Sequence, residues 1–179
     1  KAPFITLIAG ASIVKALNIL GVDAKIKWPN DITINNKKLS GILTELSAEI
    51  ERVNYIVVGI GMNVKDTDFE EELQDKATSL YKENYNVSRV DIVKEILCQF
   101  EKLYLDYIEK DDKKEVLDIC RQYSAIINKE IYVIKNDQKE LVDCIGINEE
   151  GNLIIKNKDG KLEEIMSGEV SIRGVKGYV

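Results

Sequence analysis

Histidine is absent from this sequence of 179 residues. Without an imidazole, the chain cannot contain a Ser-His or Cys-His nucleophile system of its own. The cysteines, Cys98, Cys120 and Cys144, are odd in number and show no CxxC spacing. This pattern argues against a disulfide framework and against a zinc site, so we expect a reduced, cytoplasmic setting.

Long uncharged apolar runs are also missing. The most apolar segment, residues 4–20, is short and is interrupted by Lys15 and Asn18, so it does not predict a membrane span. It lacks the flanking pattern of a signal peptide. We interpret it as a largely buried helix. Because the sequence opens with Lys-Ala-Pro and no methionine, we expect the partners of this helix to lie upstream in a longer protein.

An excess of positive charge is missing as well, because the net charge is −6. A general nucleic-acid surface is therefore not expected. The charge is unevenly distributed: residues 1–63 carry seven basic and five acidic side chains, whereas residues 64–128 carry ten and sixteen. The first third is the part best suited to an anionic substrate.

Hydrophobic residues make up 45% of the sequence, enough for a core in one domain, or in a medium and a small one. Alternating and β-branched patterns before residue 64 predict strands joined by polar turns. A tight turn is expected at Asn35-Asn36, and the continuous apolar run that ends the set predicts a central strand. The predicted strands are 24–28, 32–34, 37–47 and 53–60.

Residues 64–78 are acidic and predict a loop with a short helix. Residues 90–109, which Ser88 or Asp91 could cap, and residues 113–126 predict amphipathic helices. Five short strands then follow, which predict a small antiparallel barrel of SH3-like size. They are 131–134, 140–147, 152–156, 162–165 and 170–173. We therefore expect an α+β protein with domains 1–128 and 129–179.

The strongest motif is Lys27-Trp28-Pro29-Asn30-Asp31, followed by Lys38-Leu39-Ser40-Gly41-Ile42-Leu43. A turn at a strand end can place Asn30 and Asp31 at an open site, and the hairpin returns Lys38 alongside. A lysine beside an anionic reaction centre neutralises charge that grows in the transition state. On spacing alone, a polar hairpin with solvated lysines is the simpler interpretation.

A second motif, Gly59-Ile60-Gly61-Met62-Asn63, ends the apolar strand. Glycines there permit a ligand to approach the backbone closely. Ligands also bind at strand ends in α/β sheets. Taken alone, however, the motif favours a glycine-relieved turn.

These motifs occur in one order, with Ala77-Thr78-Ser79-Leu80 and the segment 167–173 after them, and together they resemble the signature of biotin protein ligases. The resemblance covers nearly the whole chain. It implies part of a class II aminoacyl-tRNA-synthetase-like catalytic domain and an SH3-like C-terminal domain. It also implies an enzyme that attaches biotin, through biotinyl-5′-AMP, to a lysine of a biotin carboxyl carrier domain (EC 6.3.4.15).

The resemblance further implies roles for individual residues. Lys38 would contact the biotin carboxylate and the adenylate phosphate and is the catalytic candidate. Residues 64–76 would form a loop that orders over the adenylate, and Glu169 would lie near the nucleotide. The biotin pocket would include Lys38, Gly41, Leu43, Gly59 and Gly61. The ATP site would include Lys27, Asn30, Asp31, Asn63 and Arg173, with Asp31 also facing Mg²⁺.

One family element is not found. Biotin ligases carry a glycine- and arginine-rich loop upstream of these motifs, whereas residues 1–63 contain Arg52 as their single arginine. We therefore expect the later two-thirds of a ligase, poorly active alone, with DNA contacts only through a missing N-terminal domain. An edge over residues 41–48 would permit a homodimer.

Two other functions remain open. One is a lipoate-type ligase of the same superfamily, against which the Trp-Pro pair and the C-terminal barrel argue. The other is a non-catalytic module that binds the carrier or a partner subunit.

Overall fold

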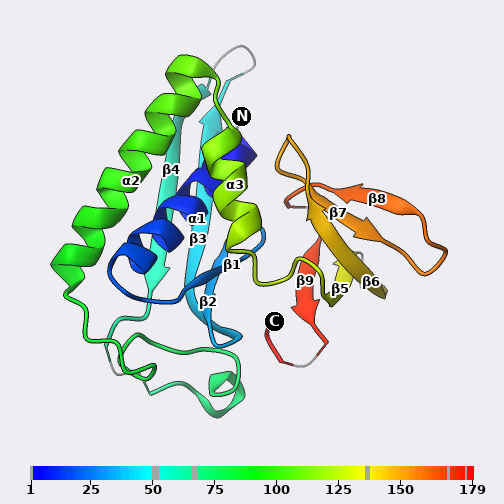
Figure 1. Ribbon diagram of the computed structural model, residues 1–179, viewed down its shortest axis with the longest axis horizontal. Coiled ribbons are helices and arrows are strands. Elements are labelled where there is room, and N and C mark those ends of the chain that lie inside the picture. Colours follow the sequence, from blue (N-terminus) through cyan, green and yellow to red (C-terminus); the bar gives the residue numbers. More distant parts are fainter. Residues whose placement is uncertain (1, 50–52, 66–67, 136–137, 169, 176) are drawn as a thin grey trace.

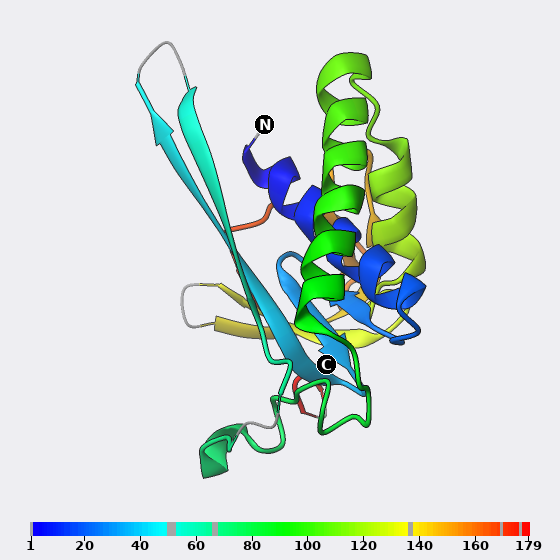
Figure 2. The same cartoon turned by 90° about the vertical axis from the view of Figure 1, so that its left-hand side faces the viewer.

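The computed structural model describes residues 2–49, 53–65, 68–135, 138–168, 170–175 and 177–179. Antiparallel sheets dominate both parts of the chain, and helices cover one face of the first sheet (Figures 1 and 2). The first part contains α1 (Ala2–Ile19), β1 (Lys25–Lys27), β2 (Asp31–Ile34), β3 (Lys37–Ala48), β4 (Val53–Met62), the short helix η1 (Glu71–Leu73), α2 (Arg89–Lys110) and α3 (Lys114–Gln122). The second contains β5 (Glu130–Lys135), β6 (Gln138–Ile147), β7 (Leu153–Lys156), β8 (Leu162–Ile165) and β9 (Ser171–Gly174).

Helix α1 is the centre of the core, as its apolar sequence predicts. Its side chains from Phe4 to Leu17 are mostly buried, and it packs against α2, α3 and β3. The hydroxyls of Thr6 and Thr44 lie 2.8 Å apart and join it to β3. Gly21 ends the helix in the left-handed region, with φ of 80°. No helix in the described ranges is long and apolar enough to cross a membrane.

The β2–β3 hairpin confirms the predicted tight turn. Asn35 and Asn36 both have positive φ, 49° and 63°, as a two-residue hairpin loop with matching twist requires. The order of the first sheet is β1-β2-β3-β4, with antiparallel pairing throughout. The hairpin brings Asp31 opposite Gly41 and so sets the geometry of the site described below.

Strand β4 lies at the edge of this sheet, so the prediction of a central strand is wrong. Its apolar run means that both faces of the strand carry apolar side chains. A strand can have this property without a neighbouring strand on each side. Tyr55 and Val57 are 61% and 49% exposed. Within the described residues, β3 beyond Gly41 also pairs with β4 alone.

The predicted helices after residue 88 are confirmed, with one shortened. The Ser88 hydroxyl accepts a hydrogen bond from Val90 N and caps α2. Helix α3 ends at Gln122 rather than at residue 126 because the following backbone pairs with β1 instead. Ile26 N donates to Tyr123 O at 2.8 Å, and Ala125 N donates to Ile26 O at 2.7 Å.

The predicted strands of the second part are all present, in the order β8-β7-β6-β5-β9. Among the described residues β8 pairs with β7 and β9 pairs with β5, so no pairing closes the sheet into a barrel. The closed SH3-like barrel is therefore not confirmed, since strand number and length do not determine whether the outer strands meet.

A buried seam fixes the second sheet against the first part of the chain. The Trp28 indole N–H donates to Gly151 O at 3.0 Å, and the side chain is 2% exposed. Gly151 has φ of 86°, and a Cβ there would lie 2.4 Å from Leu7 Cδ1. Arg121 Nε donates to Ile147 O at 2.9 Å. We call Leu7, Trp28 and Gly151 the seam; it joins the turn between β6 and β7 to α1 and to the residue that follows β1.

Candidate ligand-binding site

A cavity of about 320 Å³ opens where the β1–β2 turn, β3 and the segment leading into β9 meet. Its walls combine the first predicted motif with the middle of β3, residues 42–44, and with residues 167–168 and 170–173. The lining residues are Thr6, Lys27, Trp28, Pro29, Asn30, Asp31, Ile42, Leu43, Thr44, Ser167, Gly168, Val170, Ser171, Ile172 and Arg173.

The β1–β2 turn is anchored to β3 by Asn30. Its side-chain Nδ2 donates to Ile42 O at 2.9 Å, and its backbone carbonyl accepts from Ile42 N at 2.8 Å. Asn30 therefore lines the cavity and also fixes the turn that carries Asp31.

Lys38 and Asp31 form an ion pair across the hairpin. Lys38 Nζ lies 2.5 Å from Asp31 Oδ1. A Cβ on Gly41 would lie 3.1 Å from the same Nζ, so the glycine leaves the space through which Lys38 reaches Asp31. The structure thus brings Asp31, predicted for the ATP site, next to Lys38 and Gly41, predicted for the biotin pocket.

Tyr178, which the sequence analysis did not single out, completes this group. Its hydroxyl donates a hydrogen bond to Asp31 Oδ2. Burial, reinforced by that carboxylate, raises the pKa of the phenol, so it stays protonated as the donor. The one local signal is the Gly177-Tyr178 pair shortly after Arg173, which specifies a turn but no destination.

Lys27 is the most unusual side chain of the site because it is 2% exposed and its Nζ has no hydrogen-bond acceptor among the described residues. The Nζ lies 3.4 Å from the centre of the Tyr178 ring, a cation–π contact. Burial lowers the pKa of Lys27 from 10.5 to about 8, although Asp31 opposes the shift. A buried ammonium without a hydrogen-bond acceptor is costly, and an anionic ligand would supply the missing acceptor.

We call Lys27, Lys38 and Arg173, with Asp31 among them, the cation cluster. The Arg173 guanidinium carbon and Lys38 Nζ each lie 6.0 Å from the Tyr178 ring centre. Three positive charges around one carboxylate leave a positive excess, which attracts anionic ligands such as phosphates.

The residues predicted to line a biotin pocket share one face of the β3–β4 hairpin. Gly41 pairs with Gly61, and Leu43 pairs with Gly59, so all four project to the same side. Leu43 is 63% exposed and lines the cavity. No atom of the described residues lies within 4 Å of a Cβ built on Gly61, so this part of the face is open.

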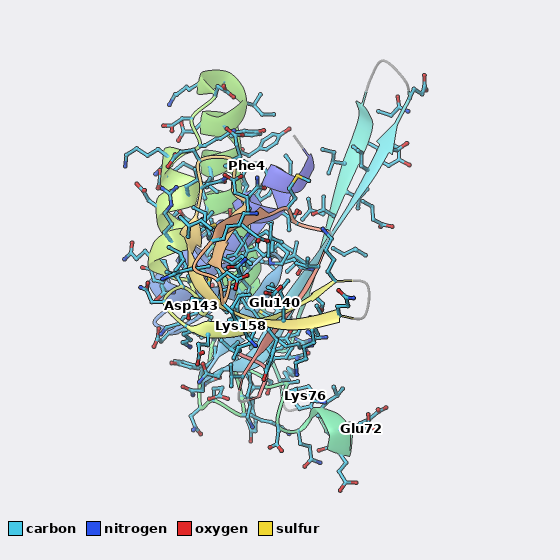
Figure 3. The ribbon with its side chains drawn as sticks, turned by 90° about the vertical axis from the view of Figure 1, so that its right-hand side faces the viewer. Phe4, Glu72, Lys76, Glu140, Asp143 and Lys158 are labelled. Carbon is cyan, nitrogen blue, oxygen red and sulfur yellow. The ribbon has the colours of Figure 1, made fainter. Side chains whose placement is uncertain are left out.

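Asn63 and the segment 64–76 are placed differently. Asn63 Nδ2 donates to Thr78 O at 3.0 Å and anchors the end of that segment, and Asn63 is not part of the cavity wall. No described residue of 64–76 lines the cavity, and the part carrying Glu72 projects away from both sheets (Figures 2 and 3). Glu169 lies outside the described residues.

Comparison with known proteins identifies the family. The profile of the Biotin/lipoate A/B protein ligase family matches residues 1–63, and that of the Biotin protein ligase C terminal domain matches residues 126–173. The structure of the biotin protein ligase from Aquifex aeolicus in complex with biotin and ATP is 30% identical, with a TM-score of 0.83, covering 97% of this chain and 72% of that one. The chain belongs to the biotin protein ligase family.

Curated biotin ligases are longer than this chain. The bifunctional ligase/repressor BirA of Bacillus subtilis is 35% identical over 96% of the chain, which spans 54% of that protein. BirA of Escherichia coli is 27% identical over 94% of the chain, which spans 53% of it. The chain thus covers about half the length of these relatives.

Proposed function

We propose that this chain forms the lysine-bearing part of a cytoplasmic enzyme that attaches biotin to a lysine of a biotin carboxyl carrier domain, through biotinyl-5′-AMP. The observation that carries the proposal is Lys27, a buried ammonium without a hydrogen-bond acceptor, beside the Lys38–Asp31 pair. Such a cluster is suited to a polyanionic substrate such as ATP. The biotin and ATP bound to the Aquifex relative supply the two substrates.

In the first step an oxygen of the biotin carboxylate attacks the α-phosphorus of ATP, and pyrophosphate leaves. In the second, the carrier lysine amine attacks the acyl carbon of the mixed anhydride, and AMP leaves. Both reacting groups of the first step are anionic, so catalysis depends on positioning and on neutralising charge. Lys38 supplies that charge at the reacting oxygens, and Lys27 and Arg173 supply it along the phosphates.

Biotin would lie on the open face of the hairpin formed by Gly41, Leu43, Gly59 and Gly61. The glycines let the ring system approach the backbone, and Leu43 supplies apolar contact. In this arrangement the carboxylate reaches Lys38 at the edge of the cation cluster. Asn63, which lies outside the cavity wall, would contribute to nucleotide binding only through the segment that it anchors, and the C-terminal sheet would act as a partly open SH3-like domain.

The donor set fits Mg²⁺ bound jointly with ATP. Magnesium is held by one or two carboxylates together with substrate phosphates, and it keeps several waters. Asp31 is a carboxylate on the cavity wall, and no group of three potential ligands occurs in the described residues, so a dedicated all-protein cage is not present there. When bound, Mg²⁺ would offset phosphate charge next to Lys27.

Titration calorimetry of this chain with biotin, with lipoate and with MgATP tests the function. We expect heat with biotin, more strongly with MgATP present, and none with lipoate. Heat with lipoate alone would favour the lipoate-type ligase, and no heat with either acid would favour a non-catalytic module that binds the carrier.

The role of Lys38 is tested in the full-length protein by biotin-dependent exchange of pyrophosphate into ATP. Loss of one transition-state donor costs about 10²–10³-fold in kcat. We expect that loss for Lys38→Ala with unchanged thermal stability, while the exposed Lys25→Ala on β1 keeps its activity. Full exchange activity in Lys38→Ala would rule out the catalytic role.

A further inference from the structure

Tyr178 engages the groups that a nucleotide would need. Its hydroxyl donates to Asp31 Oδ2, and Oδ1 forms an ion pair with Lys38 Nζ at 2.5 Å but has no hydrogen bond among the described residues. The ring covers Lys27 Nζ at 3.4 Å from its centre. One side chain therefore holds a predicted magnesium ligand and the buried cation at the same time.

The backbone that delivers Tyr178 is built for this position. Strand β9 pairs with β5 up to Gly174, and Gly174 N then donates to Tyr178 O at 3.4 Å, which folds the chain back. A Cβ on Gly174 would lie 2.2 Å from the Val179 carbonyl carbon. Gly177 has φ of 87°, a conformation that other residues rarely adopt. Two glycines thus permit the turn that places the phenol over Lys27.

Phosphate and Tyr178 would compete for the same contacts. An ammonium hydrogen bonds to a phosphate oxygen at about 2.7–2.9 Å, and the ring occupies that side of Lys27. A magnesium ion bound at Asp31 Oδ2, about 2.0–2.1 Å away, would share the space around the phenol hydroxyl that donates to the same oxygen. The ring therefore keeps a phosphate oxygen from its side of Lys27 Nζ, and the hydroxyl competes for the space at Asp31 Oδ2.

We propose that Tyr178 is an intramolecular competitor of the nucleotide: it occupies Lys27 and Asp31 in the ligand-free protein and leaves when MgATP binds. The inference rests on the proposed assignment of these two residues to ATP. A site that is open one-tenth of the time binds about tenfold more weakly than its open form, and removal of the competitor restores that factor.

Two variants separate the contacts of Tyr178. Tyr178→Phe keeps the ring over Lys27 and loses the hydrogen bond to Asp31, whereas Tyr178→Ala loses both. The control is Tyr81→Ala, which removes an aromatic ring that is 63% exposed and lies outside the cavity.

The first measurement needs no ligand. Acetic anhydride modifies accessible amines, and mass spectrometry follows the extent at Lys27. We expect faster modification of Lys27 in Tyr178→Ala than in the unaltered protein and in Tyr81→Ala. Equal rates in all three would show that the ring does not shield Lys27 and would overturn the inference.

The second measurement is calorimetric titration with MgATP. We expect Tyr178→Ala to bind about tenfold more tightly than the unaltered protein, with Tyr178→Phe between them. Weaker binding in both variants would make Tyr178 a nucleotide contact, overturning the competition while leaving the proposed function intact. Faster Lys27 modification without MgATP binding in any variant would overturn the proposed function, and the competition with it.

Discussion

Lys27 and Trp28 are consecutive residues that are both 2% exposed, yet they belong to regions with opposite properties. In the seam, the Trp28 indole N–H has an acceptor in Gly151 O, and Gly151 packs against Leu7. In the cation cluster, Lys27 Nζ has none among the described residues. Buried polar groups that are satisfied stabilise a fold, whereas an unsatisfied one next to a cavity marks a place for a ligand.

The two regions also depend on each other. The seam joins the second sheet to the first part of the chain, and β9 with the segment after it brings Arg173 and Tyr178 to the cation cluster. Disruption of the seam should therefore cost stability and ligand binding together, whereas changes in the cluster should cost binding alone. The following experiments test this difference.

The largest expected effect belongs to Trp28→Ala. Truncation of a buried tryptophan costs about 3–5 kcal/mol, measured as the free energy of unfolding in denaturant. Trp28→Phe keeps most of the ring, leaves Gly151 O without its donor and should cost about 1–3 kcal/mol. A loss below that of Trp28→Phe in the alanine variant would mean that the seam does not stabilise the protein.

Gly151→Ala comes next. The new Cβ would collide with Leu7 at a position of positive φ, and overpacking of this kind costs about 1–3 kcal/mol. Gly160→Ala is the matched control, since Gly160 has φ of 78° and its nearest contact, Lys156 Cε, is at 3.8 Å. Thermal unfolding of both variants separates the collision from the backbone strain; equal shifts would leave no role for the contact with Leu7.

Lys27→Met tests the other region. The variant keeps the apolar stem and removes a buried charge that has no hydrogen-bond acceptor among the described residues. We expect stability within about 1 kcal/mol of the unaltered protein, and binding of MgATP weakened about tenfold, equivalent to about 1.4 kcal/mol. A large loss of stability with unchanged binding would reverse the distinction between Lys27 and Trp28.

The smallest effect is expected outside both regions, at Glu115. Its carboxylate lies 2.5 Å from Lys15 Nζ and 3.1 Å from Lys102 Nζ, joining the three helices. The hydrogen bond from Lys15, more than any other contact, holds the pKa of Glu115 below 4.5. Partly exposed pairs contribute about 0.2–1 kcal/mol.

A lowered carboxylate pKa gives stability that is present above the unfolded value and is lost as the pH falls through the folded value. Glu115→Gln should therefore be less stable at pH 7, and the difference should shrink below pH 4.5. Denaturant unfolding at several pH values measures it, and a difference independent of pH would exclude the ion pair as its cause.

Much of the fold could be predicted because local patterns determine it. The apolar segment 4–20 predicts α1, and the Asn35-Asn36 pair predicts the hairpin turn. The position of β4 could not be predicted, since an apolar run does not reveal how many neighbours a strand has. Closure of the second sheet depends likewise on long-range pairing.

The part of the site that lies on the β2–β3 hairpin could be predicted from the sequence. Register across the hairpin brings Asp31 and Lys38 together, as the spacing of the motif predicts, whereas Gly41 beside them was expected only from the family resemblance. Tyr178 was missed because 147 residues separate it from Asp31, and no local pattern determines where a turn after β9 will lie. The burial of Lys27 could not be predicted either, because an alternating polar and apolar sequence predicts an exposed lysine at that position.

The backbone carbonyls of Lys38 and Leu39 hold both ends of the segment that follows β4. Asn63 N donates to Leu39 O at 3.0 Å, and Thr78 N donates to Lys38 O at 2.8 Å. The chain from Asn63 to Thr78 is therefore a loop whose two ends are hydrogen-bonded to adjacent residues of β3. Its span is fixed whatever its length, and doubling the length of such a loop costs only about 0.6 kcal/mol in closure entropy. This loop can therefore be lengthened or shortened while its two hydrogen bonds to Lys38 and Leu39 stay the same.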